Sequence, residues 1–190
     1  MVNTRPLLLP LGDELPDERG CRVTAMVESH YDAVWRALRR LGVPDRSVDD
    51  GAQRVFLVAA RKVDAIRPGE ERPYLMGIAL RVAADARRAI VRHGDVAEAD
   101  ARVADTTEGA DVLVDRKRAR VLLDAIVVSM PTDLREAFVL FELEGMTAPE
   151  VAAAMGVPLG TATSRLRRAR ELFREKVARH AASTGSGGKR

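Results

Sequence analysis

The chain has 190 residues, 46% of them hydrophobic and only 4% aromatic, so it can bury one modest core or two small ones. Such cores must be built from Ala, Val and Leu, which favours helices over sheets. The single cysteine excludes an intrachain disulfide, and the run Leu7–Leu9 is too short for a signal peptide or a membrane span. The net charge of +3 does not by itself indicate what the protein binds.

The N-terminal part of the chain contains an irregular arm followed by a predicted amphipathic helix. Residues 1–22 mix prolines, glycines and acids without a sustained period, and we expect them to form a flexible arm. From Val27 to Leu41 the apolar residues recur every three or four positions, which predicts a helix that ends at the turn Gly42–Asp45. The side chains expected to face inward are Val27, Tyr31, Val34, Trp35, Leu38 and Leu41.

Two further helices are predicted in the same part of the chain. The first covers about residues 48–63, and the loop 66–73 (IRPGEERP) leads into the second, which ends near Arg88. Their expected inward residues are Ala52, Val55, Phe56, Ala59 and Val63 in the first helix, and Leu75, Ile78, Ala79, Val82 and Ala86 in the second.

A change of composition separates these helices from the rest of the chain. Seven acids face only two arginines between residues 91 and 115, and we expect residues 93–115 to form an acidic flexible linker. The Gly/Ser-rich end, residues 181–190, is expected to be disordered. The predicted fold is therefore all-α, with two small helical domains, 23–92 and 116–180, joined by this linker.

The second helical domain carries the pattern of a helix-turn-helix. The stretch Thr147–Glu150 (TAPE) is a capping box that starts a short helix, Ala148–Met155. Gly156 supplies the backbone freedom of a tight turn, and Val157–Pro158 begin the next helix. That second helix is expected to bury Ala162, Leu166, Ala169 and Phe173.

The first turns of this second helix combine short hydroxyl side chains with arginines. A recognition helix presents its N-terminal residues to base edges in the major groove, where an arginine that forks onto guanine contributes about 1–3 kcal/mol of discrimination. A solvated basic helix end would have a similar composition, because arginines also complement the helix dipole. The candidate DNA-contacting residues are Thr161, Thr163, Ser164, Arg165, Arg167 and Arg168.

The run MPTDLREAFVLFELEGMTAPEVAAAMGVPLGTATSRLRRARELF, residues 130–173, resembles region four of the extracytoplasmic-function sigma factors of bacterial RNA polymerase. Met130 stands where the family usually has leucine, and Ala162 stands where valine is common. The resemblance implies that this domain reads the −35 element of a promoter.

The first domain resembles region two of the same family. The stretch DDGAQRVF, residues 49–56, is similar to the segment that docks on the clamp helices of the polymerase β′ subunit. The resemblance implies docking by Asp49, Asp50 and Gln53, whereas we expect Phe56 to belong to the core. Arg54 stands where the family usually has an acid, which affects the expected strength or geometry of docking.

The third predicted helix, PYLMGIALRVAADARR, resembles the family's −10-reading helix. Tyr74 stands where tryptophan is common and Arg81 where asparagine is common, and Glu71 replaces a frequent phenylalanine. Tyr74 could stack on an unpaired base or belong to the packed core. The residues that the resemblance assigns to −10 recognition are Tyr74, Arg81, Asp85 and Arg88.

The resemblance implies a cytoplasmic sigma factor that binds core RNA polymerase and promoter DNA, with an anti-sigma factor as a further partner that no residue here identifies. Two alternatives remain open: a stand-alone helix-turn-helix regulator that binds duplex DNA without polymerase, and a protein-interaction module. The sequence shows no phosphate-binding loop, zinc-protease motif or nucleophile elbow, and the three histidines lack metal-ligand spacing. We therefore expect no enzyme, no cofactor and no metal.

Overall fold

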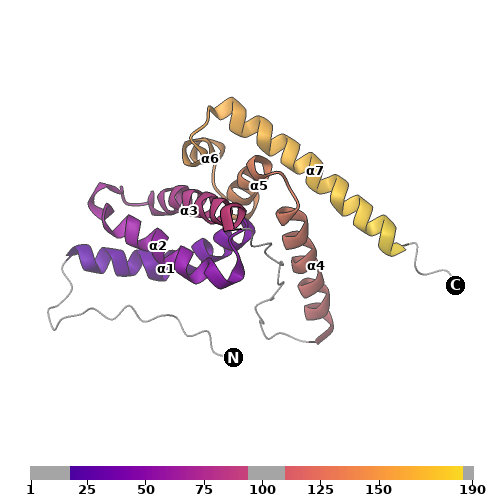
Figure 1. Cartoon of the computed structure of the whole chain (residues 1–190), viewed down its shortest axis with the longest axis horizontal. Coiled ribbons are helices and arrows are strands. Elements are labelled where there is room, and N and C mark those ends of the chain that lie inside the picture. The colour runs from indigo at the N-terminus through magenta and orange to yellow at the C-terminus, as the bar shows by residue number, and fades with distance from the viewer. Residues whose placement is uncertain (1–17, 94–109, 186–190) are drawn as a thin grey trace.

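The structure is a computed structural model that describes residues 18–93 and 110–185, and every regular element in these two ranges is helical (Figure 1). This confirms the prediction of an all-α fold. The first range, here called the first half, contains α1 (Glu18–Arg40), α2 (Asp45–Ala60), the 3-10 turn η1 (Val63–Ala65) and α3 (Glu71–His93). The second range, here called the second half, contains α4 (Ala110–Val128), α5 (Thr132–Phe138), the π-helical turn η2 (Val139–Leu143), α6 (Ala148–Met155) and α7 (Leu159–Gly185).

The first half is a bundle in which α1, α2 and α3 pack against one another. All five α2 and η1 residues that the sequence pattern placed inward are buried, and Phe56 is among them, so its expected core position is confirmed. Gly51 allows α2 to lie close to α1, because a Cβ at this position would meet Leu38 Cδ1 at 3.3 Å. The half-buried Tyr31 of α1 stacks on Phe56, with ring centroids 6.1 Å apart.

The second half is built around α7, which packs on α5 and α6. Ala162, Leu166 and Ala169 are buried as predicted, and the half-buried Phe173 stacks on Phe138 with ring centroids 5.0 Å apart. The turns after Phe138 are π-helical and end at Glu144, whose backbone N–H donates to the carbonyl of Val139 at 2.9 Å.

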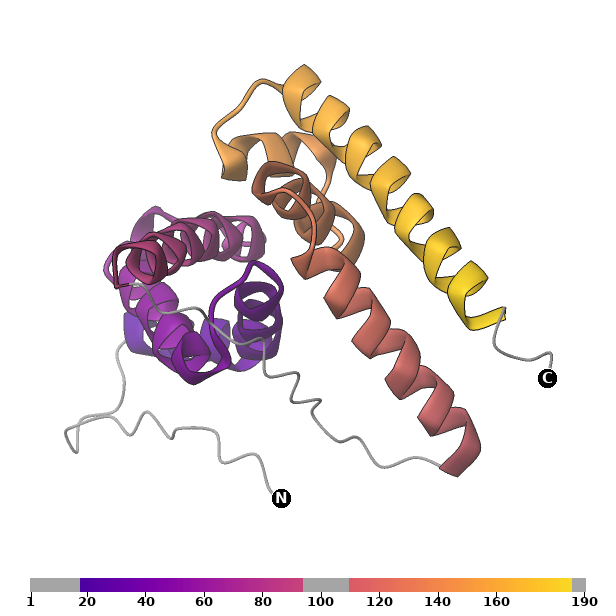
Figure 2. The same ribbon diagram turned by 45° about the vertical axis from the view of Figure 1, so that its right-hand side comes forward.

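The two halves pack together through α3 and α6, which lie side by side in both views (Figures 1 and 2). The contact is close because Gly77 has no side chain: a Cβ there would lie 3.8 Å from Ala154 Cα. Buried apolar residues of both halves form one continuous cluster.

Several helix boundaries differ from the sequence-based expectation. Helix α2 covers Asp45–Ala60 rather than about residues 48–63, and α3 continues to His93 rather than ending near Arg88. The first helix begins at Glu18 rather than near Val27, because its early turns are held by contacts that periodicity does not reveal: Arg19 donates to the carbonyl of Ala60 at 3.2 Å, and Arg22 donates to that of Ile66. Residues 18–22 of the expected arm are therefore helical.

Two further differences concern segments that composition marked as flexible. Helix α4 begins at Ala110, inside the expected linker. Helix α7 continues to Gly185, past the expected domain end at residue 180, because alanines extend it. The remainder of the expected arm, linker and tail, residues 1–17, 94–109 and 186–190, lies outside the described residues.

Candidate DNA-reading and docking surfaces

The helix-turn-helix forms at the predicted residues. Helix α6 covers Ala148–Met155 as expected, and the capping box is present, with the Glu150 carboxylate accepting the Thr147 backbone N–H at 2.7 Å. Gly156 follows in the left-handed conformation, with φ +65°, and ends the helix without steric strain because it has no Cβ. The next N–H, of Val157, donates to Ala152 O at 3.0 Å, which closes the turn into α7.

The hydroxyl side chains of α7 that are candidates for DNA contact lie at its N-terminal end. Thr163 and Ser164 are exposed, and each donates to a carbonyl of its own helix: Thr163 to Leu159 O at 2.8 Å and Ser164 to Thr161 O at 2.9 Å. Their oxygen lone pairs remain able to accept from a base edge. Thr161 itself is half-buried.

The three candidate arginines of α7 differ in their partners. Arg165 is half-buried and pairs with Asp133 of α5 at 3.5 Å, whereas the exposed Arg167 pairs with Glu171 one helical turn away at 3.2 Å. Arg168 is exposed, and no acid in the described ranges pairs with it. Of the three candidate arginines, Arg168 is therefore the one that can bind a phosphate or a guanine without first breaking an ion pair.

A neighbouring arginine, Arg170, has a structural role instead. Its Nε donates to the Glu142 carboxylate at 2.5 Å, and its guanidinium lies over the ring of Phe141, 5.0 Å from the centroid. These contacts fix α7 against η2 and so hold the orientation of the recognition helix.

The candidate docking residues on α2 separate into two kinds. Asp49 accepts hydrogen bonds from Tyr31 Oη at 3.2 Å and Trp35 Nε1 at 3.0 Å, so it ties α2 to α1. Desolvation, followed by the charge of Asp49, raises the pKa of Tyr31. Asp50 and Gln53 are exposed on the outer face of α2. The sequence analysis gave Asp49 the same role as Asp50 and Gln53, although the preceding helix carries two aromatic donors, Tyr31 and Trp35, about one turn apart.

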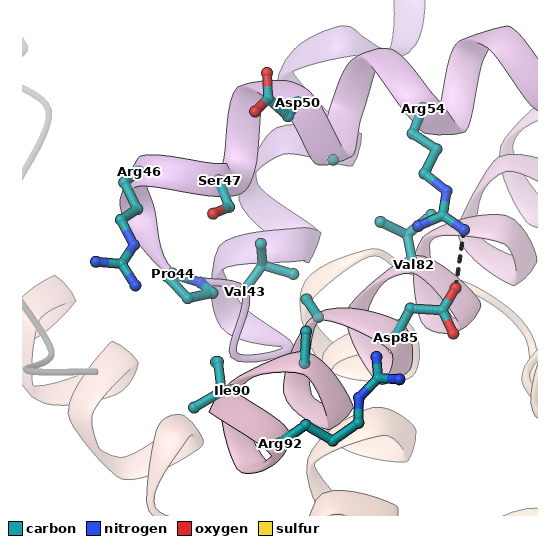
Figure 3. A pocket seen from close by; sticks show the side chains of 13 residues that line it. Val43, Pro44, Arg46, Ser47, Asp50, Arg54, Val82, Asp85, Ile90 and Arg92 are labelled. Atoms are coloured by element: carbon teal, nitrogen blue, oxygen red, sulfur yellow. Dashed lines mark hydrogen bonds and ion pairs between the residues drawn. The ribbon is translucent and has the colours of Figure 1, made fainter. Parts of the chain in front are cut away.

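A cleft of about 520 Å³ lies between α2 and α3 (Figure 3). Asp50 and Arg54 of α2 and Asp85 of α3 are among the residues that line it, so the cleft lies between the candidate docking face and the candidate −10 helix. Arg54 donates to Asp85 at 3.0 Å, and Arg88 donates to the same carboxylate. The hydrogen bond from Arg88 is the largest influence that holds the pKa of Asp85 below its ordinary value, and the charge of Arg54 adds to it.

The four candidate −10 residues share one side of α3, because they are separated by seven, four and three positions. Arg81 and Arg88 are exposed, whereas Tyr74 is half-buried and packs against the core cluster. Both roles considered for Tyr74 therefore agree with its position: part of the ring is packed and part remains accessible.

Glu71, which stands where the family often has phenylalanine, has a local structural role. Glu71 is the first residue of α3, where its carboxylate accepts the backbone N–H of Gly69 at 2.7 Å and pairs with Arg22 at 3.6 Å. Desolvation acts to raise its pKa, but the hydrogen bonds from backbone N–H groups and from Arg22 outweigh it, and the pKa lies below its ordinary value. Glu71 therefore starts the helix and anchors it to α1.

Sequence reasoning gave no role to the buried residue Glu144. Among the described residues it is the one charged residue that is buried, and its carboxylate accepts from Arg72 Nη2 at 3.1 Å. Desolvation raises the pKa of Glu144, and the nearby arginines 72, 36 and 40 oppose that effect. No sequence signal predicted this contact, because Arg72 and Glu144 belong to different halves.

Two classes of site receive no support in the described parts of the chain. No group of three or more His, Cys, Asp or Glu side chains in residues 18–93 and 110–185 is arranged to hold a metal ion. Every helix in these ranges is too short or too polar to cross a bilayer.

Comparisons with known proteins agree with the division into two halves. The family model for Sigma-70 region 2 matches residues 26–93, and the model for Sigma-70, region 4 matches residues 120–173. The sigma factor SigE of Mycolicibacterium smegmatis, of the class called ECF, is 30% identical over 161 residues, which are 84% of this chain and 63% of that protein. The ECF sigma-E factor of Escherichia coli K12 is 34% identical over 146 residues, which are 71% of this chain and 76% of the relative.

Two solved structures have a similar fold. CnrH in complex with the cytosolic domain of CnrY matches with a TM-score of 0.60 and 26% identity over 82% of this chain and 87% of that one. The sigma factor RpoE of Bartonella quintana, in complex with the anti-sigma factor NepR, matches with a TM-score of 0.64 over 82% of this chain and 96% of the other, at 20% identity.

Proposed function

The chain belongs to the extracytoplasmic-function sigma factors of RNA polymerase, and from this premise we propose that it binds core polymerase and directs it to promoters whose −35 and −10 elements it reads. The observation that carries the proposal is the presence of both sigma regions in one chain, each with accessible residues of the required chemistry. We assign region two to residues 23–92 and region four to residues 116–180.

The −35 element is read, in this proposal, by the N-terminal turns of α7. Thr163 and Ser164 present hydroxyl oxygens to base edges, and Arg168 supplies the free cation. Arg167 can exchange its exposed ion pair with Glu171 for a phosphate at little cost, because such pairs contribute only about 0–1 kcal/mol. Arg165 and Thr161, which are half-buried, then border the contact.

The −10 element and the polymerase are assigned to the two sides of the α2–α3 cleft. Asp50 and Gln53 form the docking face, and the exposed Asp49 borders it while its hydrogen bonds tie α2 to α1. On α3, Tyr74 and Arg81 supply a stacking face and a cation for unpaired bases, whereas Asp85 and Arg88 are positioned by their mutual contact.

A stand-alone helix-turn-helix regulator is not favoured, because such a protein has no need of a region-two domain with a polymerase-docking face. Sigma factors are initiation factors rather than enzymes, and we propose no catalytic activity for this chain. We also propose that it works in the cytoplasm beside the polymerase. Because CnrH and RpoE were each solved with a bound protein, an anti-sigma factor is proposed as a further partner.

Run-off transcription on a pool of genomic fragments tests the proposal. Core polymerase is assayed with and without the chain, and discrete transcripts that need the chain are expected. Their start sites would identify the −35 and −10 sequences. Transcripts that do not depend on the chain, together with tight binding of the chain alone to duplex DNA, would favour the stand-alone regulator.

A further inference from the structure

The loop 67–70, between η1 and α3, is held at both of its ends by one side chain of α1. Arg22 Nη2 donates to the carbonyl of Ile66, the residue that follows η1, and pairs at 3.6 Å with Oε1 of Glu71, the first residue of α3. Ile66 is itself buried in the core. The side chains of Arg22 and Glu71 are only 31% and 21% exposed, so solvent screens this ion pair less than one on the open surface. Arg22 therefore bridges the two ends of the loop.

Two hydrogen bonds from the backbone of the loop, together with Gly69, define its path. Gly69 N–H donates to the other carboxylate oxygen of Glu71 at 2.7 Å, and Glu70 N–H donates to the Arg67 carbonyl at 3.0 Å. Gly69 has φ +87°, a conformation that favours glycine. Residues 67–70 are all exposed, and the ion pair of Arg67 with Glu70, at 3.9 Å, is too exposed to hold them firmly. The path of the loop therefore depends on Glu71, which binds the loop and Arg22 at the same time.

The position of Tyr74 depends on the same loop. Its backbone N–H donates to the carbonyl of Glu70 at 3.2 Å, so the first turn of α3 starts from the last residue of the loop. The ring of Tyr74 is half-buried, and we have assigned its accessible part to stacking on an unpaired −10 base. A binding group works well only when its supporting contacts hold it within a fraction of an ångström of the productive position. A displacement of the loop therefore changes how well this base is held.

We propose that Arg22 and Glu71 are positioning residues for −10 recognition. They hold the loop 67–70 and the first turn of α3 in the arrangement that presents Tyr74 to an unpaired base, and they thereby set how strictly that base is selected. Neither residue contacts DNA in this account, because each acts through Tyr74. The inference rests on the proposed sigma function and on the role of Tyr74 within it.

Arg19 offers a matched control for Arg22. It lies three residues earlier on the same helix and makes contacts of the same two kinds: it donates to the carbonyl of Ala60 at 3.2 Å and pairs with Asp64 at 3.6 Å. These partners lie at the end of α2 and in η1, before the loop. R19A therefore removes an arginine with a carbonyl partner and an acidic partner, as R22A does, but leaves the ends of the loop bridged.

Transcription from two promoter pools measures the base preference of each variant. Both pools derive from a promoter that the wild-type chain uses: one has a random −10 element and a fixed −35 element, and the other has the reverse. A barcode in the transcribed part identifies the promoter of each transcript. Core polymerase is supplied with wild type, R22A, E71Q, R19A, Y74A or R22A/Y74A, and circular dichroism at the assay temperature checks that each variant is folded.

E71Q keeps the fold under milder conditions than R22A does. Its amide oxygen can still accept the Gly69 N–H, whereas the charge that pairs with Arg22 is lost. If R22A does not fold, E71Q alone decides the test.

We expect one −10 position at which the wild-type chain prefers its best base by about tenfold, as a single mismatch costs in a specific site. R22A and E71Q should lose most of that preference while their −35 preference stays as in wild type, and R19A should keep both preferences. R22A should add nothing to the effect of Y74A, because two changes that act through one group are not additive.

Three results would overturn the inference. The first is a wild-type −10 preference in folded R22A, or in E71Q where R22A does not fold. The second is an equal loss of preference in R19A, which would show that any loosening of α1 has this effect. The third is a further loss in R22A/Y74A beyond Y74A, which would show that Arg22 does not act through Tyr74. If the wild-type chain directs no transcription at all, the proposed sigma function itself fails, which is a different outcome.

Discussion

Arg54 of α2 donates to Asp85 of α3 at 3.0 Å, across the cleft that joins the candidate docking face to the candidate −10 helix. Arg54 is also the position at which the sequence departs from the family's usual acid. The departure therefore creates a cross-helix ion pair. All three docking candidates are exposed, but Asp49 is held by α1, whereas Asp50 and Gln53 are not.

The two arginines that pair with Asp85 are expected to affect its titration unequally. The hydrogen bond from Arg88 is the larger cause of the lowered pKa of Asp85, so R88A should raise that pKa more than R54A does. Because the pKa is depressed in the folded chain, any stabilisation by the carboxylate is present above the ordinary pKa and lost as pH falls through the folded value. NMR titration of the Asp85 carboxyl carbon in both variants measures the order, and a larger effect of R54A would contradict this assignment.

Arg168 and Arg170 form a matched pair for testing the recognition helix. R168A should weaken −35-dependent transcription and lower the salt dependence of DNA binding by about one unit of slope, because one phosphate contact is lost. Its thermal stability should be unchanged, since no acid in the described ranges pairs with Arg168. R170A should instead lower the melting temperature, because it removes the contacts with Glu142 and Phe141.

The comparison of these two variants separates a DNA contact from a structural contact. It requires melting curves and a salt titration of binding to a −35 duplex for each protein. Equal melting temperatures, together with equal salt slopes, would show that the two arginines have not been assigned correctly.

Local patterns were sufficient to predict the helices and the helix-turn-helix. The α6 boundaries and the inward faces of α2 and α7 depend on spacing and capping within a few residues, and the structure agrees with them. Composition was a weaker guide at the ends of helices, since the acids that indicated a linker also occur in α4. Periodicity reports on a helix's own face and not on partners far away in sequence.

Two of the contacts that the sequence did not predict join different helices. Asp49 was grouped with Asp50 because both are acidic and adjacent, yet only the packing of α1 on α2 shows that Asp49 binds two aromatic side chains. Glu144 and Arg72 are 72 residues apart, and their pairing depends on how the two halves meet. A single sequence holds no local signal for such a pairing.

The acids of α2 offer a further test, because their roles now differ. D50N combined with Q53A should weaken binding to core polymerase without changing the melting temperature, since both side chains are exposed. D49A should lower the free energy of unfolding by on the order of 1 kcal/mol, because Tyr31 and Trp35 lose an acceptor. Equilibrium binding to core polymerase and urea unfolding of both variants measure the two effects. If the D50N/Q53A variant binds core polymerase as tightly as wild type, Asp50 and Gln53 do not form the docking face.

The capping box of α6 gives the last prediction. The backbone hydrogen bond from Thr147 is the largest cause of the lowered pKa of Glu150, and the Thr147 hydroxyl adds to it. T147A should therefore lower the free energy of unfolding by about 1 kcal/mol, as lost N-caps do. E150A should also destabilise the chain at neutral pH, where the carboxylate is fully charged.

The effect of E150A should depend on pH in one direction. Because the folded pKa of Glu150 lies below its ordinary value of 4.5, its contribution is complete above that value and is lost as pH falls through the folded pKa. Urea unfolding of wild type and E150A at pH 7 and pH 3 measures the difference, which should shrink at the lower pH. E150Q is the matched control, since an amide oxygen can still accept the Thr147 N–H without titrating, and its own unfolding free energy should stay closer to wild type at both values. A difference between wild type and E150A that grows at pH 3 would show that the ionised carboxylate does not stabilise the start of the helix-turn-helix.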